Sequence, residues 1–196
     1  MKNRLLLLIV LLVTTFSIFA QSSQREHFSP EFKISYNLQI NTLFGSNGFG
    51  VGVHNAFFNQ NRFNLVVGLE YNAVFFKIYF LESDFVPQLH FVGIPINARV
   101  NFGKNVKFFI EAGAFFDPIV LEKHIFFEKE HQKTEKTVYL YKPDFGLSGG
   151  IGLRIPFKKY EILIKSDYKW GMGSLVEFCP AARYNRYWRF AVGFKM

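Results

Sequence analysis

The 196-residue sequence contains a single cysteine, Cys179, so no disulfide can form within the chain. After residue 20 it also lacks any apolar run long enough to cross a bilayer as a helix. None of the five histidines forms a His-x-x-x-His pair and no Cys-x-x-Cys occurs, so we expect no metal site. Acidic residues are scarce, with 15 against 23 basic ones, which gives a formal net charge of +8.

Hydrophobic residues are abundant even though a helical span is missing. They make up 49% of the chain, and aromatic residues, including 26 Phe, make up 19%. So many aromatic residues are hard to place in a water-soluble core of this size. They fit the lipid-facing wall and the interfacial belts of a membrane β-barrel.

The first twenty residues have the organisation of an export signal. Lys2 and Arg4 precede an apolar run from Leu5 to Val13, and Ala20 is a small residue before Gln21. We expect a signal peptide at 1–20, a periplasmic N-terminal segment at 21–30 and an outer-membrane domain at 31–196. A basic chain can bind nucleic acid, but an exported one meets anionic lipid headgroups, so we expect outer-membrane lipid and no nucleic acid as partner.

The last ten residues alternate strictly between apolar and polar positions. Trp188, Phe190 and Val192 alternate with Arg189 and Ala191. A side-chain period of two predicts a β-strand with one face in an apolar medium and the other in a polar one. The same period recurs in seven upstream segments: 31–43, 48–58, 63–76, 90–102, 106–117, 144–157 and 160–171.

Short and long connections alternate between these segments. The short ones are 59–62, 103–105 and 158–159, and the long ones are roughly 77–89, 118–143 and 172–186. Transmembrane barrels have short periplasmic turns and long outer loops. The sequence therefore predicts an all-β fold, an eight-stranded antiparallel up-and-down transmembrane β-barrel in a bacterial outer membrane, with a lumen filled by side chains. The alternative is a soluble lipocalin-like barrel, whose interior is apolar.

Four segments carry a family resemblance: G-I-P-I-N-A-R-V at 93–100, F-I-E-A-G-A at 109–114, D-F-G-L-S-G-G-I-G-L at 144–153, and Gly193-Phe194. With them the chain resembles the small outer-membrane β-barrel proteins of Bacteroidota, a group that includes PorT-like proteins. The resemblance implies the same architecture and the barrel insertion machinery as a partner. Because PorT-like members take part in protein secretion, it also implies an envelope or secretion-system protein as a partner.

Charged residues on the polar faces of the strands form the main candidate site. Because an unpaired charge in a narrow lumen is costly, we expect a salt-bridge network that closes the barrel, with Glu111 as its central acid. The expected members are Glu70, Arg99, Glu111, Arg154, Lys165, Asp167, Lys169 and Arg189. The alternative is a narrow channel, which the excess of cations would bias towards anions.

Two long connections are candidate contact surfaces. The apolar loop 77–89 is either a partner-contact surface or an interfacial aromatic belt that extends two strands. As a contact surface, its contact residues would be Tyr79, Phe80, Phe85 and Val86. The segment 118–143 has mixed charges. We expect it to be either a solvated protrusion or an extended hairpin that binds a partner by strand addition.

No residue is predicted to be catalytic, and no cofactor is expected. Some eight-stranded outer-membrane barrels modify lipid A with a Ser, a His and an acid at the outer rim. Here His27 is two residues before Ser29, on the wrong side of the barrel, and His124 has no adjacent Ser. A catalytic triad is recognised by geometry. A rim-located lipid A-modifying hydrolase therefore remains the alternative to a non-enzymatic protein whose outer loops bind a partner or envelope component.

Overall fold

The computed structural model of the chain describes residues 29–39, 46–60, 62–76, 78–79, 84–127, 133–136, 142–173 and 185–196. The strands in these ranges are β1 (Glu31–Gln39), β2 (Ser46–Gln60), β3 (Phe63–Phe76), β4 (Ile78–Tyr79), β5 (Asp84–Phe102), β6 (Lys107–Asp117), β7 (Ile119–Phe127), β8 (Lys133–Lys136), β9 (Asp144–Phe157), β10 (Tyr160–Gly171) and β11 (Arg186–Lys195). No helix within the described ranges is long and apolar enough to cross a membrane. The predicted signal peptide and Cys179 lie outside the described residues.

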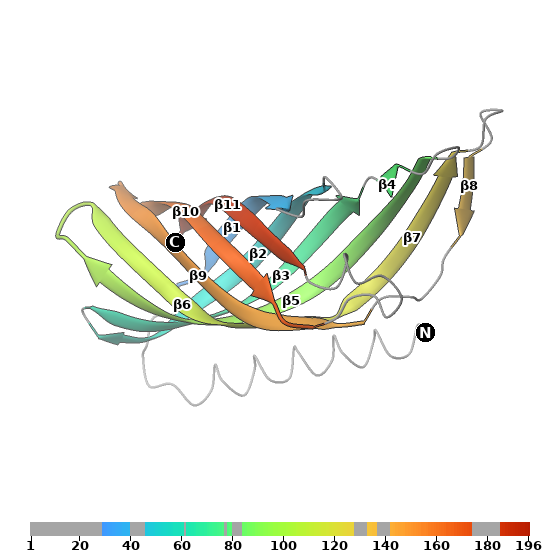
Figure 1. Cartoon of the computed structure of the whole chain (residues 1–196). Helices are drawn as coiled ribbons and strands as arrows, with labels where there is room; N and C mark the ends of the chain where they lie inside the picture. Colours follow the sequence, from blue (N-terminus) through green and yellow to red (C-terminus); the bar gives the residue numbers. More distant parts are fainter. Residues whose placement is uncertain are drawn as a thin grey trace.

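Eight of these strands close into an antiparallel barrel, and this confirms the predicted fold (Figure 1). Hydrogen-bonded neighbours follow the order β3-β2-β1-β11-β10-β9-β6-β5, and β5 pairs with β3 to complete the ring. The first and last strands of the chain pair directly, from Glu31↔Lys195 to Gln39↔Tyr187. Closure gives each of the eight strands a partner on both edges.

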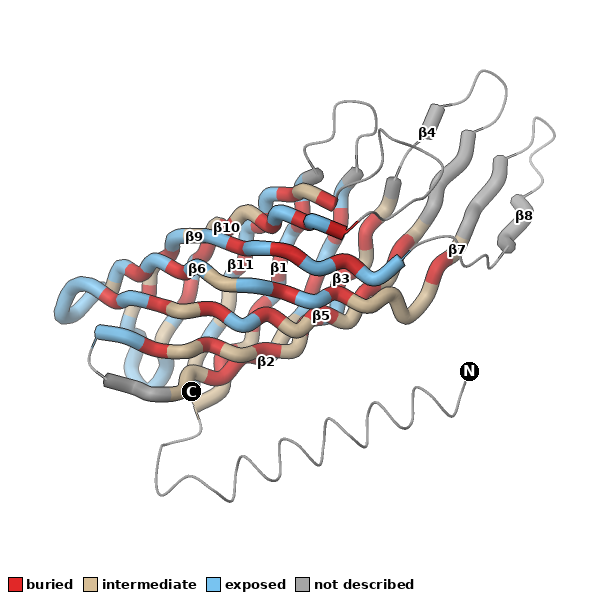
Figure 2. The backbone as a smooth tube through the Cα atoms, turned by 60° about the horizontal axis from the view of Figure 1, so that its bottom comes forward, coloured by how far each residue is buried: buried red, intermediate tan, exposed pale blue. Residues whose placement is uncertain are grey.

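Alternate residues of the wall strands face the lumen and the outside. In β1 the exposed fraction is 68% for Ile34 and 8% for Ser35, and in β11 it is 59% for Val192 and 3% for Arg189. Figure 2 shows the alternation as red and pale-blue bands along the strands. An apolar outer wall around a polar interior is the arrangement of a barrel in lipid. It is the reverse of the lipocalin-like alternative.

The two ends of the barrel differ. The turn end carries the short connections after β2, β5 and β9, and the loop end carries the longer ones. Gly103 and Lys158, each in one of the short turns, adopt positive φ angles of 96° and 57°, which tight hairpin turns often require. The main-chain N–H of Met196 donates to the carbonyl oxygen of Pro30 at 3.4 Å. The start of β1 and the end of β11 therefore meet at the turn end.

The strand predicted at 90–102 is longer than expected. β5 already begins at Asp84, and the two residues of β4 pair with it through Ile78↔Phe85 and Tyr79↔Asp84. The interpretation of 77–89 as a loop is therefore wrong for most of its length, and the strand extension of the alternative interpretation is present in β4 and β5. Alternation did not reveal the strand because apolar residues such as Phe85 and Val86 are consecutive in the sequence.

The segment 118–143 also contains strands. β7 follows β6 after Pro118 and pairs with the first part of β5, from Asp84↔Phe127 to Phe91↔Ile119. β8 in turn pairs with β7. The strands β4, β5, β7 and β8 thus form a small sheet at the loop end, called the outer sheet below and visible at the upper right of Figure 1. Paired strands are therefore present in this segment, as the expected extended hairpin requires, and β7 additionally pairs with β5.

Candidate functional site

The eight predicted network residues all face the lumen and are buried, with exposed fractions between 0% for Arg99 and 5% for Glu70. They come from β3, β5, β6, β9, β10 and β11. Each faces inward because it occupies the polar phase of its alternating strand. In a barrel of eight strands, side chains from opposite walls meet across the lumen.

Arg99 joins two carboxylates near the turn end. Its guanidinium donates to Glu31 at 2.5 and 2.8 Å and to Glu111 at 2.5 Å. Arg154 donates to the same Glu31 at 2.7 Å, and the ammonium of Lys33 lies 3.1 Å from it. Planar guanidinium groups that bind carboxylates through two nitrogens make geometrically specific pairs. These pairs connect β1, β5, β6 and β9 across the lumen.

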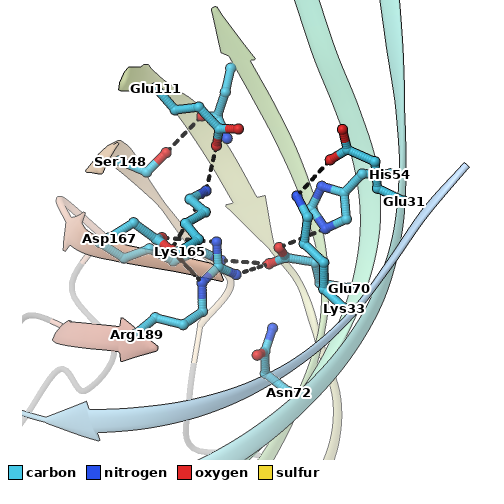
Figure 3. Close-up of polar contacts among 12 residues, drawn as sticks. Glu31, Lys33, His54, Glu70, Asn72, Glu111, Ser148, Lys165, Asp167 and Arg189 are labelled. Atoms are coloured by element: carbon cyan, nitrogen blue, oxygen red, sulfur yellow. Dashed lines mark hydrogen bonds and ion pairs between the residues drawn. The ribbon is translucent and has the colours of Figure 1, made fainter. Parts of the chain in front are cut away.

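The middle of the lumen continues the chain of ion pairs (Figure 3). Lys165 lies 2.5 Å from the Glu111 carboxylate and 3.5 Å from Asp167. Arg189 binds Asp167 at 2.8 Å and also donates to Glu70. Glu70 on β3 is therefore linked to Glu111 on β6 through these basic side chains and Asp167.

The chain of ion pairs extends towards the loop end through Lys169. Its ammonium lies 3.3 Å from Glu70 and 3.1 Å from Asp117. Asp117 pairs across β6 and β9 with Asp144, which is also buried. Alternating acids and bases thus run without interruption from Glu31 to Asp117.

Four lumen residues of the network were not among the predicted members. Glu31, Lys33 and Asp117 are buried and each makes an ion pair, and the buried His54 ring lies 3.1 Å from the Glu70 carboxylate. Their signal was present in the sequence, since each lies on the polar phase of its strand. Glu111 is not the most connected acid, because Glu31 and Glu70 each contact three basic side chains.

Aromatic rings also occupy the lumen, which was expected to be polar. Phe109 lies with its ring centroid 4.7 Å from the Arg99 guanidinium carbon, and Phe115 lies 4.6 Å from the Lys169 ammonium. A cation over an aromatic face is attracted by the quadrupole of the ring. Glycine makes room for such bulk: a Cβ on Gly152 would lie 2.3 Å from the Phe109 ring.

One cavity among the charged side chains is small. The cavity bordered by His54, Glu70 and Arg189 has a volume of about 10 Å³, which is about what one water molecule needs. A lumen filled in this way holds its side chains in place through mutual ion pairs.

The other predicted contact residues lie in the outer sheet. Tyr79 is in β4, and Phe85 and Val86 are in β5, where Val86 pairs with Ile125 of β7. Phe80 lies outside the described residues. Among the described residues, no group of three or more His, Cys, Asp or Glu is arranged to hold a metal ion.

Comparisons with known proteins support the fold and do not identify a function. No family model and no curated protein matches the chain. Neisserial surface protein A is similar in structure, with a TM-score of 0.52 and 14% identity over 86% of this chain and 96% of that one. The outer-membrane protein OprG of Pseudomonas aeruginosa gives a TM-score of 0.49 and 8% identity over 86% and 94% of the two chains. The chain thus has the fold of the small outer-membrane β-barrels.

Proposed function

We propose that this chain is an outer-membrane protein related to the PorT-like group, with a lumen closed by ion pairs and an outer sheet that binds an envelope or secretion-system protein. The turn end then faces the periplasm and the loop end faces outwards. The protein is not an enzyme in this proposal. Its membrane contacts are outer-membrane lipid, and its insertion depends on the barrel insertion machinery.

Two aromatic belts support the membrane location. Exposed rings near the loop end are those of Tyr36, Tyr71, Trp170 and Trp188, and exposed rings at the turn end are those of Phe63, Phe102, Phe157 and Tyr160. Between them the wall is aliphatic, with Ile34, Val51 and Ile151 all more than half exposed. Aromatic belts that flank an apolar band are typical of barrels at the two membrane interfaces.

The outer sheet carries the binding proposal. Within the described part of the chain, β8 pairs with β7 on one edge and with no strand on the other. An unpaired edge offers a row of N–H and C=O groups to which another chain can add a strand. The sequence of β8, Lys-Thr-Glu-Lys, carries charges of both signs and so discourages self-pairing while allowing a partner with matching charges.

Proline substitutions test this edge. N–H groups of adjacent strand residues point to opposite edges, so one of Thr134→Pro and Glu135→Pro removes an N–H from the free edge and the other removes one from the edge facing β7. With a photo-crosslinking residue at Lys133 in the native envelope, we expect a discrete crosslinked species that the free-edge proline abolishes. Unchanged crosslinking in both variants would refute strand addition, provided that both barrels still fold.

The closed lumen and the absence of catalysis need separate tests. In a planar bilayer we expect no conductance steps, whereas regular anion-selective steps would establish the channel alternative.

Incubation of the purified protein with lipid A should leave the mass of the lipid unchanged. A shortened lipid product that is lost in His124→Ala would establish the hydrolase alternative.

A further inference from the structure

The short turns of the barrel carry a ring of basic side chains. Arg62, Lys104, Lys158 and Lys159 are all exposed, and the turns that hold them contain no acidic residue. The turns join β2 to β3, β5 to β6 and β9 to β10, three hairpins that follow one another around the barrel, with β1 and β11 completing it. The four charges are therefore distributed around the rim of the turn end instead of forming one patch. We call them the basic ring.

Each member of the basic ring lies next to an exposed aromatic side chain. Phe63 follows Arg62, Phe102 precedes Lys104 by two residues, and Phe157 and Tyr160 flank the two lysines; their exposed fractions are between 48% and 55%. Aromatic rings of a barrel mark the boundary between hydrocarbon and headgroups. One or two further residues add about 3–7 Å, and long basic side chains extend towards the polar side. Their charges therefore reach the depth of lipid phosphates.

Acidic groups do not neutralise the basic ring. Glu161 is close to the turn end, but its carboxylate pairs with the Lys107 ammonium at 3.6 Å and with the Arg154 guanidinium at 3.7 Å. Within the described residues no carboxylate pairs with the four ring members. Their positive charge is available to an external anion.

Lys158 gives a second, independent observation. Its φ of 57° is left-handed, a conformation that Gly and Asn adopt more easily than Lys. Its ammonium lies 5.8 Å from the centroid of the Phe157 ring, at the level of the aromatic belt. The geometry of the turn does not favour a lysine at this strained position. We therefore attribute the presence of Lys158 to its positive charge.

We propose that the basic ring is a binding surface for the anionic phospholipid headgroups of the leaflet that the turns face. The proposal rests on the membrane location proposed above. Positive side chains near an anionic membrane surface are attracted to it, and salt weakens the attraction. The ring would thereby fix the depth of the barrel at its periplasmic interface.

Spin-labelled lipids test the proposal on the folded protein. The protein is reconstituted in phosphatidylcholine vesicles with trace spin-labelled phosphatidylglycerol or phosphatidylcholine, and electron paramagnetic resonance measures the immobilised boundary lipid. At low salt we expect a roughly twofold preference for phosphatidylglycerol that disappears at high ionic strength. The variant R62Q/K104Q/K158N/K159Q should lose it, and the charge-conserving R62K/K159R should keep it.

Several outcomes would overturn the proposal. These are an unchanged preference in the fourfold variant, a preference that salt does not affect, and a loss in the charge-conserving control. Lys158→Asn alone should raise thermal stability while lowering the preference; a fall in both would give Lys158 a structural role instead. Absence of any immobilised lipid would refute the membrane location itself, which separates the two failures.

Discussion

Arg99 shows how individual side chains close the lumen. It is fully buried, binds Glu31 and Glu111, and lies over the Phe109 ring. A buried ion pair adds little net stability compared with apolar residues of the same shape, but removal of one partner leaves the others buried and uncompensated. The network therefore affects stability mainly because the loss of one member leaves its partners buried without a counter-charge.

We expect Arg99→Gln to lower the free energy of unfolding by about 3–5 kcal/mol. Urea titration of the barrel in vesicles would measure the loss. Lys107→Gln is the matched control, since this rim lysine is 40% exposed and pairs with Glu161 at 3.6 Å; its loss should be below about 1 kcal/mol. Equal losses in the two variants would show that lumen and rim pairs are equivalent.

His54 and Gly68 are coupled across β2 and β3. A Cβ on Gly68 would lie 2.5 Å from the His54 ring nitrogen Nδ1. Gly68→Ala should therefore cost about 1–3 kcal/mol through overpacking, and less in a His54→Ala background. A double-mutant cycle measures the difference as an interaction energy, and additive losses would contradict the proposed contact.

At the residue scale, the two-residue alternation identified which side chains face the lumen. It did not identify which side chains they contact on other strands. It placed Arg99, Glu111 and Lys165 on the inward face, where the structure brings them together. The importance of Glu31 could not be inferred, because two of its three basic contacts, Arg99 and Arg154, come from β5 and β9, far away in sequence. Inward-facing Phe109 was missed because it interrupts the polar phase.

At the scale of elements, the strands of the barrel wall could be predicted from the sequence, and the outer sheet could not. Alternation gave strands close to β3, β6, β9 and β10, since one face is apolar and the other polar there. Beyond the wall, the sequences of β5 and β7 do not alternate between apolar and polar residues. Periodicity therefore carries no information about the first residues of β5 or about its pairing with β7.

The outer wall of β1 gives a prediction for one element. Ile34 pairs with Val51 and Val192, and all three are exposed. If lipid covers this face, Ile34→Lys should destabilise the barrel by roughly 2–4 kcal/mol, seen as a lower folded fraction in vesicles. Asn105→Lys, in an exposed turn, should fold like the parent chain. Normal folding of Ile34→Lys would mean that water covers the face.

At the scale of the whole molecule, the fold, the filled lumen and the belts describe one arrangement. Eight paired strands leave no free edge in the wall, ion pairs join opposite walls, and apolar residues such as Ile34, Val51 and Val192 face outwards. Such a barrel exposes its apolar surface to lipid and keeps its charges paired inside. Its two ends are then free to differ, with a basic ring at one and the outer sheet at the other.

The central claim, a closed barrel in an outer membrane, is tested most directly by heat-modifiable migration. An outer-membrane fraction is run on a detergent gel with and without boiling. Because a closed barrel with paired edges resists detergent until it is heated, we predict that the unboiled and boiled protein migrate differently. Identical migration, with the protein recovered in the soluble periplasm, would contradict the account.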